Sequence, residues 1–176
     1  MSKQDIMLRP FQNSDYEAYK WVHDHQLPSV NEFDEGYFFS ETITPRFFQT
    51  MVTMHESLRE DQDAYIYGAF NELNQLVGII ELITISDDYR KAEVKLRVFN
   101  LYFNQGYGKA MIKKIFNEAQ SIGYTHLVAH CPLHHNVAHQ LFISCGFKDE
   151  GAQLVQECDQ ICWPTKRVFS AVLQCK

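Results

Sequence analysis

The chain has 176 residues, a mass of 20.6 kDa and a formal net charge of −6 at pH 7. This length suits one domain covering residues 1–176, and a hydrophobic fraction of 45% excludes an intrinsically disordered chain. The acidic balance argues against nucleic acid as a partner, because phosphate contacts need clustered Lys and Arg. Since no apolar run could span a bilayer and no signal peptide is evident, we expect a cytoplasmic protein without a membrane partner.

The hydrophobic pattern predicts a mixed α/β chain in the order β-α-α-β-β-β-α-β-α-β-β. In chain order, the expected elements are residues 6–10, 14–25, 45–59, 65–70, 76–85, 92–99, 108–122, 125–131, 136–144, 153–157 and 168–173. The strand–helix–strand units after residue 92 imply a crossover and parallel pairing at the centre, joined to an antiparallel meander. We therefore expect a central mixed sheet flanked by helices.

Two helix starts have sequence signatures. Ser14 and Glu17 have the spacing of a capping box, and Thr44 before Pro45 is the expected cap of the second helix. The loop between these helices, residues 27–43, is long, acidic and aromatic, and loops of this length inside a domain are usually functional or mobile. The second helix is predicted to bury one side, made of Phe47, Phe48, Met51 and Met54.

A glycine-bearing turn lies between the strand at 92–99 and the next helix. Gly106 and Gly108 let a ligand approach the backbone, and the first-turn amides of a helix favour an anion. Lys109 and Lys113 add positive charge. The turn matches neither GxxxxGK[ST] nor GxGxxG, so it predicts an anion site other than a Walker or Rossmann nucleotide loop.

The wider context carries a family resemblance. The segment VFNLYFNQGYG at residues 98–108 resembles the acetyl-CoA loop of the GNAT acetyltransferases, V-x-P-x-Y-[RQ]-G-K-G-x-G. Downstream, HNVAHQLFISCGF at residues 135–147 resembles their N-x-x-[AS]-x-x-L-Y-x-x-x-G-F. The MLRP, LVG and AEV segments of three earlier strands are also similar to the family. The LRP start, AEV and the length look most like the Rim-type subgroup, which acetylates protein N-termini, and its small-molecule relatives.

The resemblance implies a GNAT fold with a splayed sheet, and an N-acetyltransferase that uses acetyl-CoA and no metal. The family's cofactor-binding positions fall on Val98, Phe99, Phe103, Asn104, Gln105, Gly106, Tyr107, Gly108, Lys109, His135 and Phe142. In this family a primary amine attacks the thioester directly in a ternary complex. The expected acceptor is a small-molecule amine or a protein N-terminus, and homodimers formed through sheet edges are common among such enzymes.

Four of the departures from the family pattern affect the expected chemistry of the site. Phe103 replaces an Arg or Gln and Asn104 replaces the first glycine, so the pyrophosphate must rely mainly on backbone amides. His135 replaces an Asn. Phe142 replaces the tyrosine that commonly protonates the leaving thiolate. Phenylalanine cannot donate a proton, although the thiolate of a thiol with a pKa of about 8.5 needs little help to leave.

Three residues compete as the general base that takes the amine proton. Glu81 lies mid-strand beside the cofactor strand, Glu93 matches a family glutamate, and His130 lies on the strand facing the splay. Histidine is the side chain best suited to proton transfer near neutral pH. The developing oxyanion is expected to meet a backbone N–H at Val98 or Phe99.

Residues of the acidic loop are predicted to form a wall of the acceptor site. Phe33, Asp34 and Glu35 lie at its centre, and the two carboxylates are expected to attract a cationic amine. A solvated loop without a ligand is an equal alternative.

Other functions are also open. Phe103 and Phe142 favour, as the second hypothesis, an acyl-CoA-binding regulatory module with little catalysis. Cys131 beside His130 suggests a Cys/His nucleophile, whereas the scattered cysteines otherwise indicate reduced thiols. A metal-dependent hydrolase is a third hypothesis, built on histidines 126, 130, 134, 135 and 139.

Overall fold

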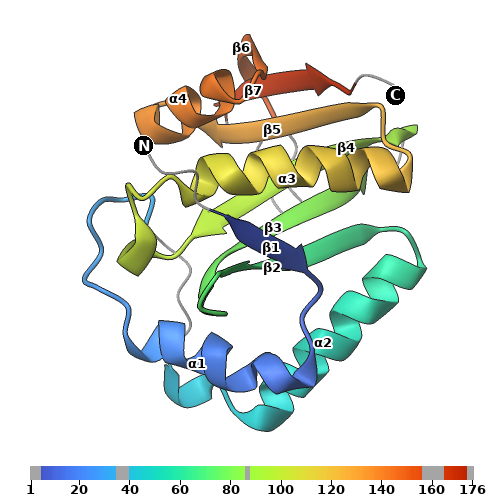
Figure 1. Ribbon diagram of the computed structural model, residues 1–176. Helices are drawn as coiled ribbons and strands as arrows, with labels where there is room; N and C mark the ends of the chain where they lie inside the picture. Colours follow the sequence, from blue (N-terminus) through green and yellow to red (C-terminus); the bar gives the residue numbers. More distant parts are fainter. Residues whose placement is uncertain (1–4, 35–39, 86–87, 156–164, 174–176) are drawn as a thin grey trace.

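A seven-stranded sheet forms the centre of the computed structural model, which describes residues 5–34, 40–85, 88–155 and 165–173 (Figure 1). The strands are β1 (Ile6–Arg9), β2 (Ala64–Asn71), β3 (Leu76–Ile85), β4 (Asp88–Val98), β5 (His126–Pro132), β6 (Lys148–Leu154) and β7 (Thr165–Val172). Their order across the sheet is β1-β2-β3-β4-β5-β7-β6, and neighbours are antiparallel except β4 and β5. The α-helices are α1 (Tyr16–Asp24), α2 (Pro45–Glu60), α3 (Tyr107–Ile122) and α4 (Asn136–Ser144).

The order of elements confirms the predicted mixed α/β chain. The penultimate strand is misplaced in the prediction, because it runs over Lys148–Leu154 and not over 153–157. A register shift between Asp149 and Gly151 interrupts the alternation of side chains in this strand, so its period is hidden in the sequence. No helix in the described ranges is long and apolar enough to cross a membrane.

The start of α1 also differs from the prediction. Ser14 and Glu17 do not form its capping box; Asp15 accepts a hydrogen bond from the Gln12 amide at 2.8 Å instead. The Arg9 guanidinium donates to both oxygens of Asp15 at 2.6 and 2.7 Å. Because Asp15 is buried, these charge-assisted bonds hold the turn from β1 into α1.

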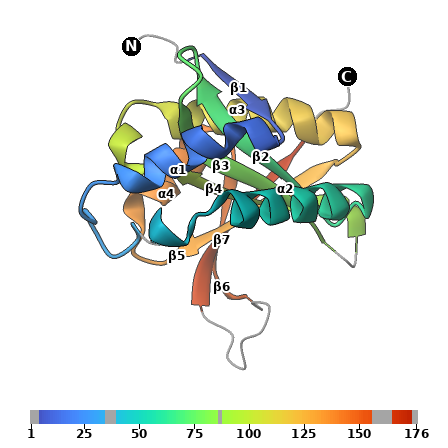
Figure 2. The same ribbon diagram turned by 90° about the horizontal axis from the view of Figure 1, so that it is seen from below.

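The two faces of the sheet have separate hydrophobic cores. Figure 1 shows α3 in front of the strands, and Figure 2 shows α3 and α2 on opposite sides of them. The core beneath α3 and α4 includes Ile80, Leu82, Val94, Met111, Ile112, Ile115, Leu127, Phe142 and Phe169. The core beneath α1 and α2 includes Phe11, Tyr19, Val22, Phe48, Val52, Ile66 and Phe70. Successive side chains of a strand point to opposite faces of the sheet, so neighbouring residues of one strand contribute to different cores and residues two positions apart to the same core.

The sheet divides between β4 and β5. Their register joins Lys91 with His126, Ala92 with Leu127, and Glu93 with Val128. Beyond Glu93, β4 continues to Val98 paired with β3, whereas β5 continues to Pro132 paired with β7. The central strands thus separate as the family resemblance implies, and one edge of β4 faces the opening, which we call the split.

Candidate active site

The turn from β4 into α3 has the backbone geometry of an anion-binding loop. Asn104 has a φ of 59° and Gly106 a φ of 87°, both in the left-handed region. Asparagine is one of the few residues besides glycine that visit this region, so Asn104 is compatible with a position where the family has glycine. Since α3 begins at Tyr107, the amides of its first turn lack acceptors within the helix and are available to an anion.

Gly108 brings the first turn of α3 close to two other elements. A methyl group at this residue would lie 3.1 Å from Leu141 Cδ2 of α4 and 3.6 Å from Val98 Cγ2 of β4. The first of these contacts is tighter than ordinary van der Waals packing. A side chain at this position would therefore press against Leu141, which would have to shift by a few tenths of an ångström.

The two backbone amides predicted to meet the oxyanion are not equally available. The Phe99 N–H donates to the Val77 carbonyl at 3.0 Å, which rules it out as the oxyanion donor and corrects the prediction. Backbone N–H groups of successive strand residues point to opposite edges. The Val98 N–H consequently points toward the split.

Several predicted cofactor positions have side chains inside the protein. Tyr107 is buried and packs edge-on against Tyr102, with ring centroids 5.8 Å apart. Phe142 is buried against Phe147 and Phe169, with centroid distances of 5.2 and 5.1 Å. The side chains that remain exposed at the loop are those of Asn104, Gln105 and Lys109, and Phe103 is half-buried. The buried residues can thus contribute only backbone atoms or shape to a cofactor site.

His135 connects α4 with the acidic loop. Its Nδ1 accepts a hydrogen bond from the Ala138 amide at 3.4 Å and caps α4. Its ring stacks on Phe33, with centroids 4.3 Å apart and planes 7° apart. Burial lowers the pKa of His135, which suits a neutral ring that accepts at Nδ1. The residues predicted for cofactor and for acceptor therefore meet in one contact.

Asn100 ties the same loop to the end of β4. Its side-chain amide donates to the Leu27 carbonyl at 2.8 Å and to Asp34 Oδ2 at 3.0 Å, while its oxygen accepts from the Leu27 N–H at 3.0 Å. Asp34 also accepts from the Val30 amide at 3.2 Å. The Asp34 carboxylate thus holds the loop in place, whereas Glu35 lies outside the described residues. Asn100 was missed as a site residue, although it occupies the position of the family's proline.

A cavity of about 1000 Å³ opens on the face of the sheet opposite α3. Its walls come from Tyr19 of α1, the first turns of α2, Ile79 and Glu81 of β3, and residues 95–97 of β4. Burial raises the pKa of Glu81, and the positive charges of Lys95 and Arg97 only partly oppose this. The β4 wall of the cavity is the same segment whose other edge faces the split.

The other two predicted bases form a pair where the sheet divides. His130 Nδ1 lies 2.9 Å from Glu93 Oε1, and both side chains are less than a quarter exposed, at 19% and 23%. Burial disfavours the charged form of Glu93, but the His130 hydrogen bond and the Lys95 charge together hold the pKa of Glu93 below its usual value. The Glu93 carboxylate is therefore hydrogen-bonded to His130, whereas Glu81 lines the cavity.

The sequence did not reveal the cavity wall supplied by α2. Phe47, Phe48, Met51 and Met54 were predicted as core. Phe48 is buried, and Phe47 and Met51 are partly buried against the same core, whereas Met54 is 53% exposed. Phe47, Met51 and Met54 also line the cavity. Arg46 was the one sequence feature that pointed to this wall. A cation in the first turn of a helix is unfavourable, because it lies at the positive end of the helix dipole.

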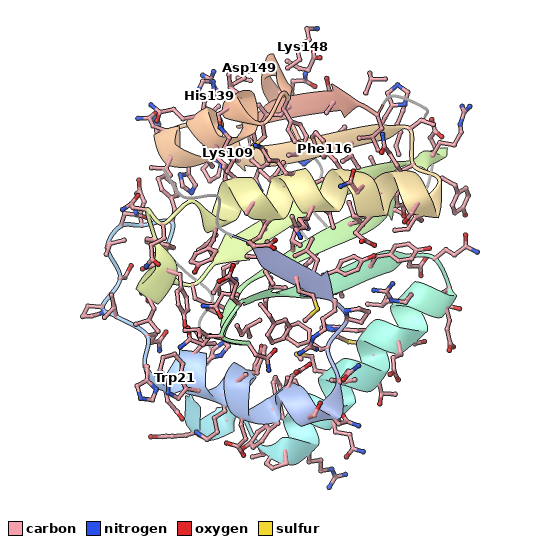
Figure 3. The ribbon with its side chains drawn as sticks, in the orientation of Figure 1. Trp21, Lys109, Phe116, His139, Lys148 and Asp149 are labelled. Atoms are coloured by element: carbon pink, nitrogen blue, oxygen red, sulfur yellow. The ribbon has the colours of Figure 1, made fainter. Side chains whose placement is uncertain are left out.

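The histidines considered for a metal site have other contacts. His139 Nε2 lies 3.0 Å from Asp149 Oδ2, which also accepts from Arg167 at 2.7 Å. Figure 3 shows His139 and Asp149 beside each other, apart from Lys109 on α3. Within the described ranges, no three His, Cys, Asp or Glu side chains are grouped so as to hold a metal ion.

Cys131 and His130 point to opposite faces of β5, because adjacent strand residues alternate. Cys131 belongs to the core beneath α3, and burial raises the pKa of its thiol. His130 instead contacts Glu93 on the other face. The Cys/His nucleophile considered above is therefore not assembled.

Residues 14–147 match the family model for the acetyltransferase (GNAT) family. Because this match spans most of the chain, the protein belongs to the GNAT family and is an acyltransferase. No curated protein sequence matches the chain at a significant level.

Solved acetyltransferase structures share the fold. The microcin C7 self-immunity acetyltransferase MccE, in complex with acetyl-CoA and AMP, superposes with a TM-score of 0.75 at 14% identity, covering 97% of this chain and 93% of that chain. RimL, a ribosomal α-N-protein acetyltransferase in complex with coenzyme A, gives 0.73 at 14%, covering 98% and 96%. Spermidine N-acetyltransferase from Vibrio cholerae, in complex with CoA and spermine, gives 0.69 at 15%, covering 96% and 95%. At these identities the likeness establishes the fold.

Proposed function

We propose that the protein transfers an acetyl group from acetyl-CoA to a primary amine, by direct attack within one ternary complex. The observation that carries this proposal is the shared segment of β4. Residues 95–97 line the cavity on one face, while the strand edge beside them borders the split. An amine in the cavity and a thioester in the split would therefore meet at β4.

The anionic part of the cofactor would lie at the start of α3. The amides from Asn104 to Lys109 and the Lys109 ammonium supply donors and charge for a pyrophosphate. The Val98 N–H would bind the oxyanion that forms on the thioester carbonyl. His135 and the buried Phe142 would shape the neighbouring wall.

Glu81 is the proposed general base. The amine nitrogen bonds to the acetyl carbon, the carbon–sulfur bond breaks, Glu81 takes the amine proton directly or through water, and the CoA thiolate acquires a proton from solvent. A carboxylate with a raised pKa is a stronger base than an ordinary one, and burial raises that of Glu81. Glu93 and His130 are alternative candidates for the general base, because this hydrogen-bonded pair also lies beside β4.

Release of CoA thiol from acetyl-CoA tests the proposal. The purified protein is incubated with a broad panel of amines and N-terminal peptides, and CoA affinity is measured separately by calorimetry. We expect CoA binding together with amine-dependent thiol release. Absence of CoA binding would overturn both the cofactor and the reaction.

The alternative is an acyl-CoA-binding regulatory module with little turnover. It is favoured by Phe142, which cannot protonate the thiolate and which packs as a core residue between Phe147 and Phe169. This alternative predicts tight CoA binding without acetylation of any amine. Robust turnover with one acceptor excludes it.

Two further points belong to the proposal. A cytosolic location agrees with the scattered cysteines of the sequence. A homodimer would form through a sheet edge, of which β1 and β6 are the two. Sedimentation or light scattering of the purified protein tests the second point.

A further inference from the structure

One residue of the cavity wall is a buried tyrosine, Tyr19 of α1. It is only 2% exposed. Among the residues that the structure describes, none forms a hydrogen bond with its hydroxyl. Buried tyrosine hydroxyls usually find such a partner, because leaving a buried polar group unpaired costs free energy. The Tyr19 hydroxyl is therefore left to bind what occupies the cavity.

Three aromatic neighbours fix the ring of Tyr19. The ring centroids of Phe48 and Phe11 lie 5.1 and 5.8 Å from that of Tyr19, and the centroid of His23, one turn later on α1, lies at 4.5 Å. Tyr19, Phe11 and Phe48 all belong to the core beneath α1 and α2. Because close packing leaves a side chain little rotational freedom, the hydroxyl holds one position on the cavity wall.

The Tyr19 hydroxyl and the Glu81 carboxylate share one part of the cavity wall. Glu81 and Ile79 lie two residues apart on the same face of β3, and Arg97 is opposite Ile79 in the β3–β4 register. Burial raises the pKa of both Tyr19 and Glu81, and the charge of Arg97 partly opposes this in each of them. The hydroxyl and the carboxylate thus lie around the same guanidinium. In agreement with this, α1 packs against β3.

The protonation state of the hydroxyl limits its role. Burial raises the pKa of Tyr19 to about 12, so the phenol keeps its proton at neutral pH. A neutral phenol can donate one hydrogen bond and can accept others through its oxygen. Tyr19 is therefore suited to bind a substrate group, whereas the base is Glu81.

We propose that Tyr19 binds the acetyl acceptor, and that its phenolic oxygen accepts one N–H of the primary amine while Glu81 takes the proton of another. This inference rests on the proposed acetyltransferase function and adds an acceptor-binding residue to it. An ammonium group has three N–H donors, so a second N–H remains bonded to Tyr19 after one proton has passed to Glu81. Tyr19 keeps its own proton, and the bonds that form and break are those of the acetyl transfer.

The Tyr19→Phe variant tests the contact, because it removes the hydroxyl and keeps the ring. We expect KM for the acceptor to rise about tenfold, the effect of one hydrogen bond. CoA affinity and kcat should be unchanged, since the contact is present both before and during the attack. The factor should be the same for an N-terminal peptide and for an unrelated small-molecule amine, because both supply the same nitrogen. A rise confined to one acceptor would mean that Tyr19 contacts another group of that molecule, and would overturn the inference.

Tyr16→Phe is the matched control on the same helix. The Tyr16 hydroxyl donates to the Ile43 carbonyl at 3.2 Å, and Tyr16 is not part of the described cavity wall. This variant should lower the urea midpoint of unfolding and leave KM unchanged. Tyr19→Phe should do the reverse and raise KM without lowering the midpoint, because no hydrogen bond to a described residue is lost. A lower midpoint with unchanged KM in Tyr19→Phe would indicate a purely structural tyrosine and overturn the inference.

The outcomes separate this inference from the proposed function. Turnover that is equal in Tyr19→Phe and in the parent protein overturns the inference and leaves the acetyltransferase intact. If no amine is acetylated, the proposed function fails, and calorimetry of the same amines with the CoA-bound protein then decides the inference. An amine that binds about tenfold more weakly to Tyr19→Phe supports the contact, whereas equal affinity, or no binding by any amine, overturns it.

Discussion

Glu81 of β3 and Lys95 of β4 are opposite each other on adjacent antiparallel strands and line the same cavity. A cross-strand cation normally favours an ionised carboxylate. Burial nevertheless dominates and raises the pKa of Glu81. The pair thus places a carboxylate with a raised pKa directly opposite a cation on the cavity wall.

The Glu81→Gln variant should lose activity without losing the fold. If Glu81 is the base, the rate should fall by about 10²–10⁴, with CoA affinity unchanged in calorimetry. Glu72→Gln, an exposed change in the β2–β3 turn, should retain full rate. Full activity of Glu81→Gln would transfer the role to Glu93 or His130, each of which can be substituted in the same assay.

The same substitution has a predictable effect on stability. With a raised native pKa, the folded protein binds more protons than the unfolded chain between the ordinary and the raised value, so stability falls as pH rises through that window. Glu81→Gln removes this titration. Urea unfolding at pH 5 and pH 8 should therefore show a smaller loss of stability in the variant than in the parent protein.

The pair of Glu93 and His130 should show the opposite pH dependence. Because the native pKa of Glu93 is depressed, its stabilising contribution is present above the ordinary glutamate pKa and is lost as pH falls through the native value. A double-mutant cycle with Glu93→Gln and His130→Ala should give a coupling of about 1 kcal/mol at pH 7. A coupling near zero would mean that the 2.9 Å contact does not stabilise the protein.

Asn104 provides a test of the anion-binding loop. At its φ of 59°, Asn104→Val should cost about 1–2 kcal/mol and weaken CoA binding, because a β-branched residue resists this conformation. Asn104→Gly is the matched control, since glycine accepts the same φ and should preserve CoA affinity. Equal CoA affinity in both variants would place the cofactor elsewhere.

Asn100 should couple the acidic loop to acceptor binding. Asn100→Ala removes three hydrogen bonds to Leu27 and Asp34 and should lower the free energy of unfolding by about 2 kcal/mol. We also expect a higher KM for the acceptor, measured by thiol release at saturating acetyl-CoA. Asn13→Ala, at an exposed asparagine, should change neither quantity.

Sequence patterns predicted helix ends correctly where the end depends only on neighbouring residues. Thr44 caps α2 as expected, with Oγ1 accepting from the Phe47 amide at 3.1 Å, and Gly123 ends α3 with a φ of 112°. The cap of α1 was wrong because Asp15 is recruited by Arg9, a residue of another element. The strand β6 was misplaced because its bulge depends on pairing with β7.

The same distinction between local and long-range contacts holds for the candidate site. The sequence alone determined the order of elements and the glycine-bearing turn before α3, since these depend on neighbouring residues. Only the tertiary structure decided that Phe99 gives its amide to Val77, that Asp34 is bound by Asn100, and that Glu93 is paired with His130. It also decided that Arg46 and Lys95, distant in the chain, share a cavity with Glu81. The burial and the charge of a site depend on several elements that only folding brings together. Composition therefore gave an acidic protein, whereas the structure places Arg46, Lys95 and Arg97 on the walls of one cavity with Glu81.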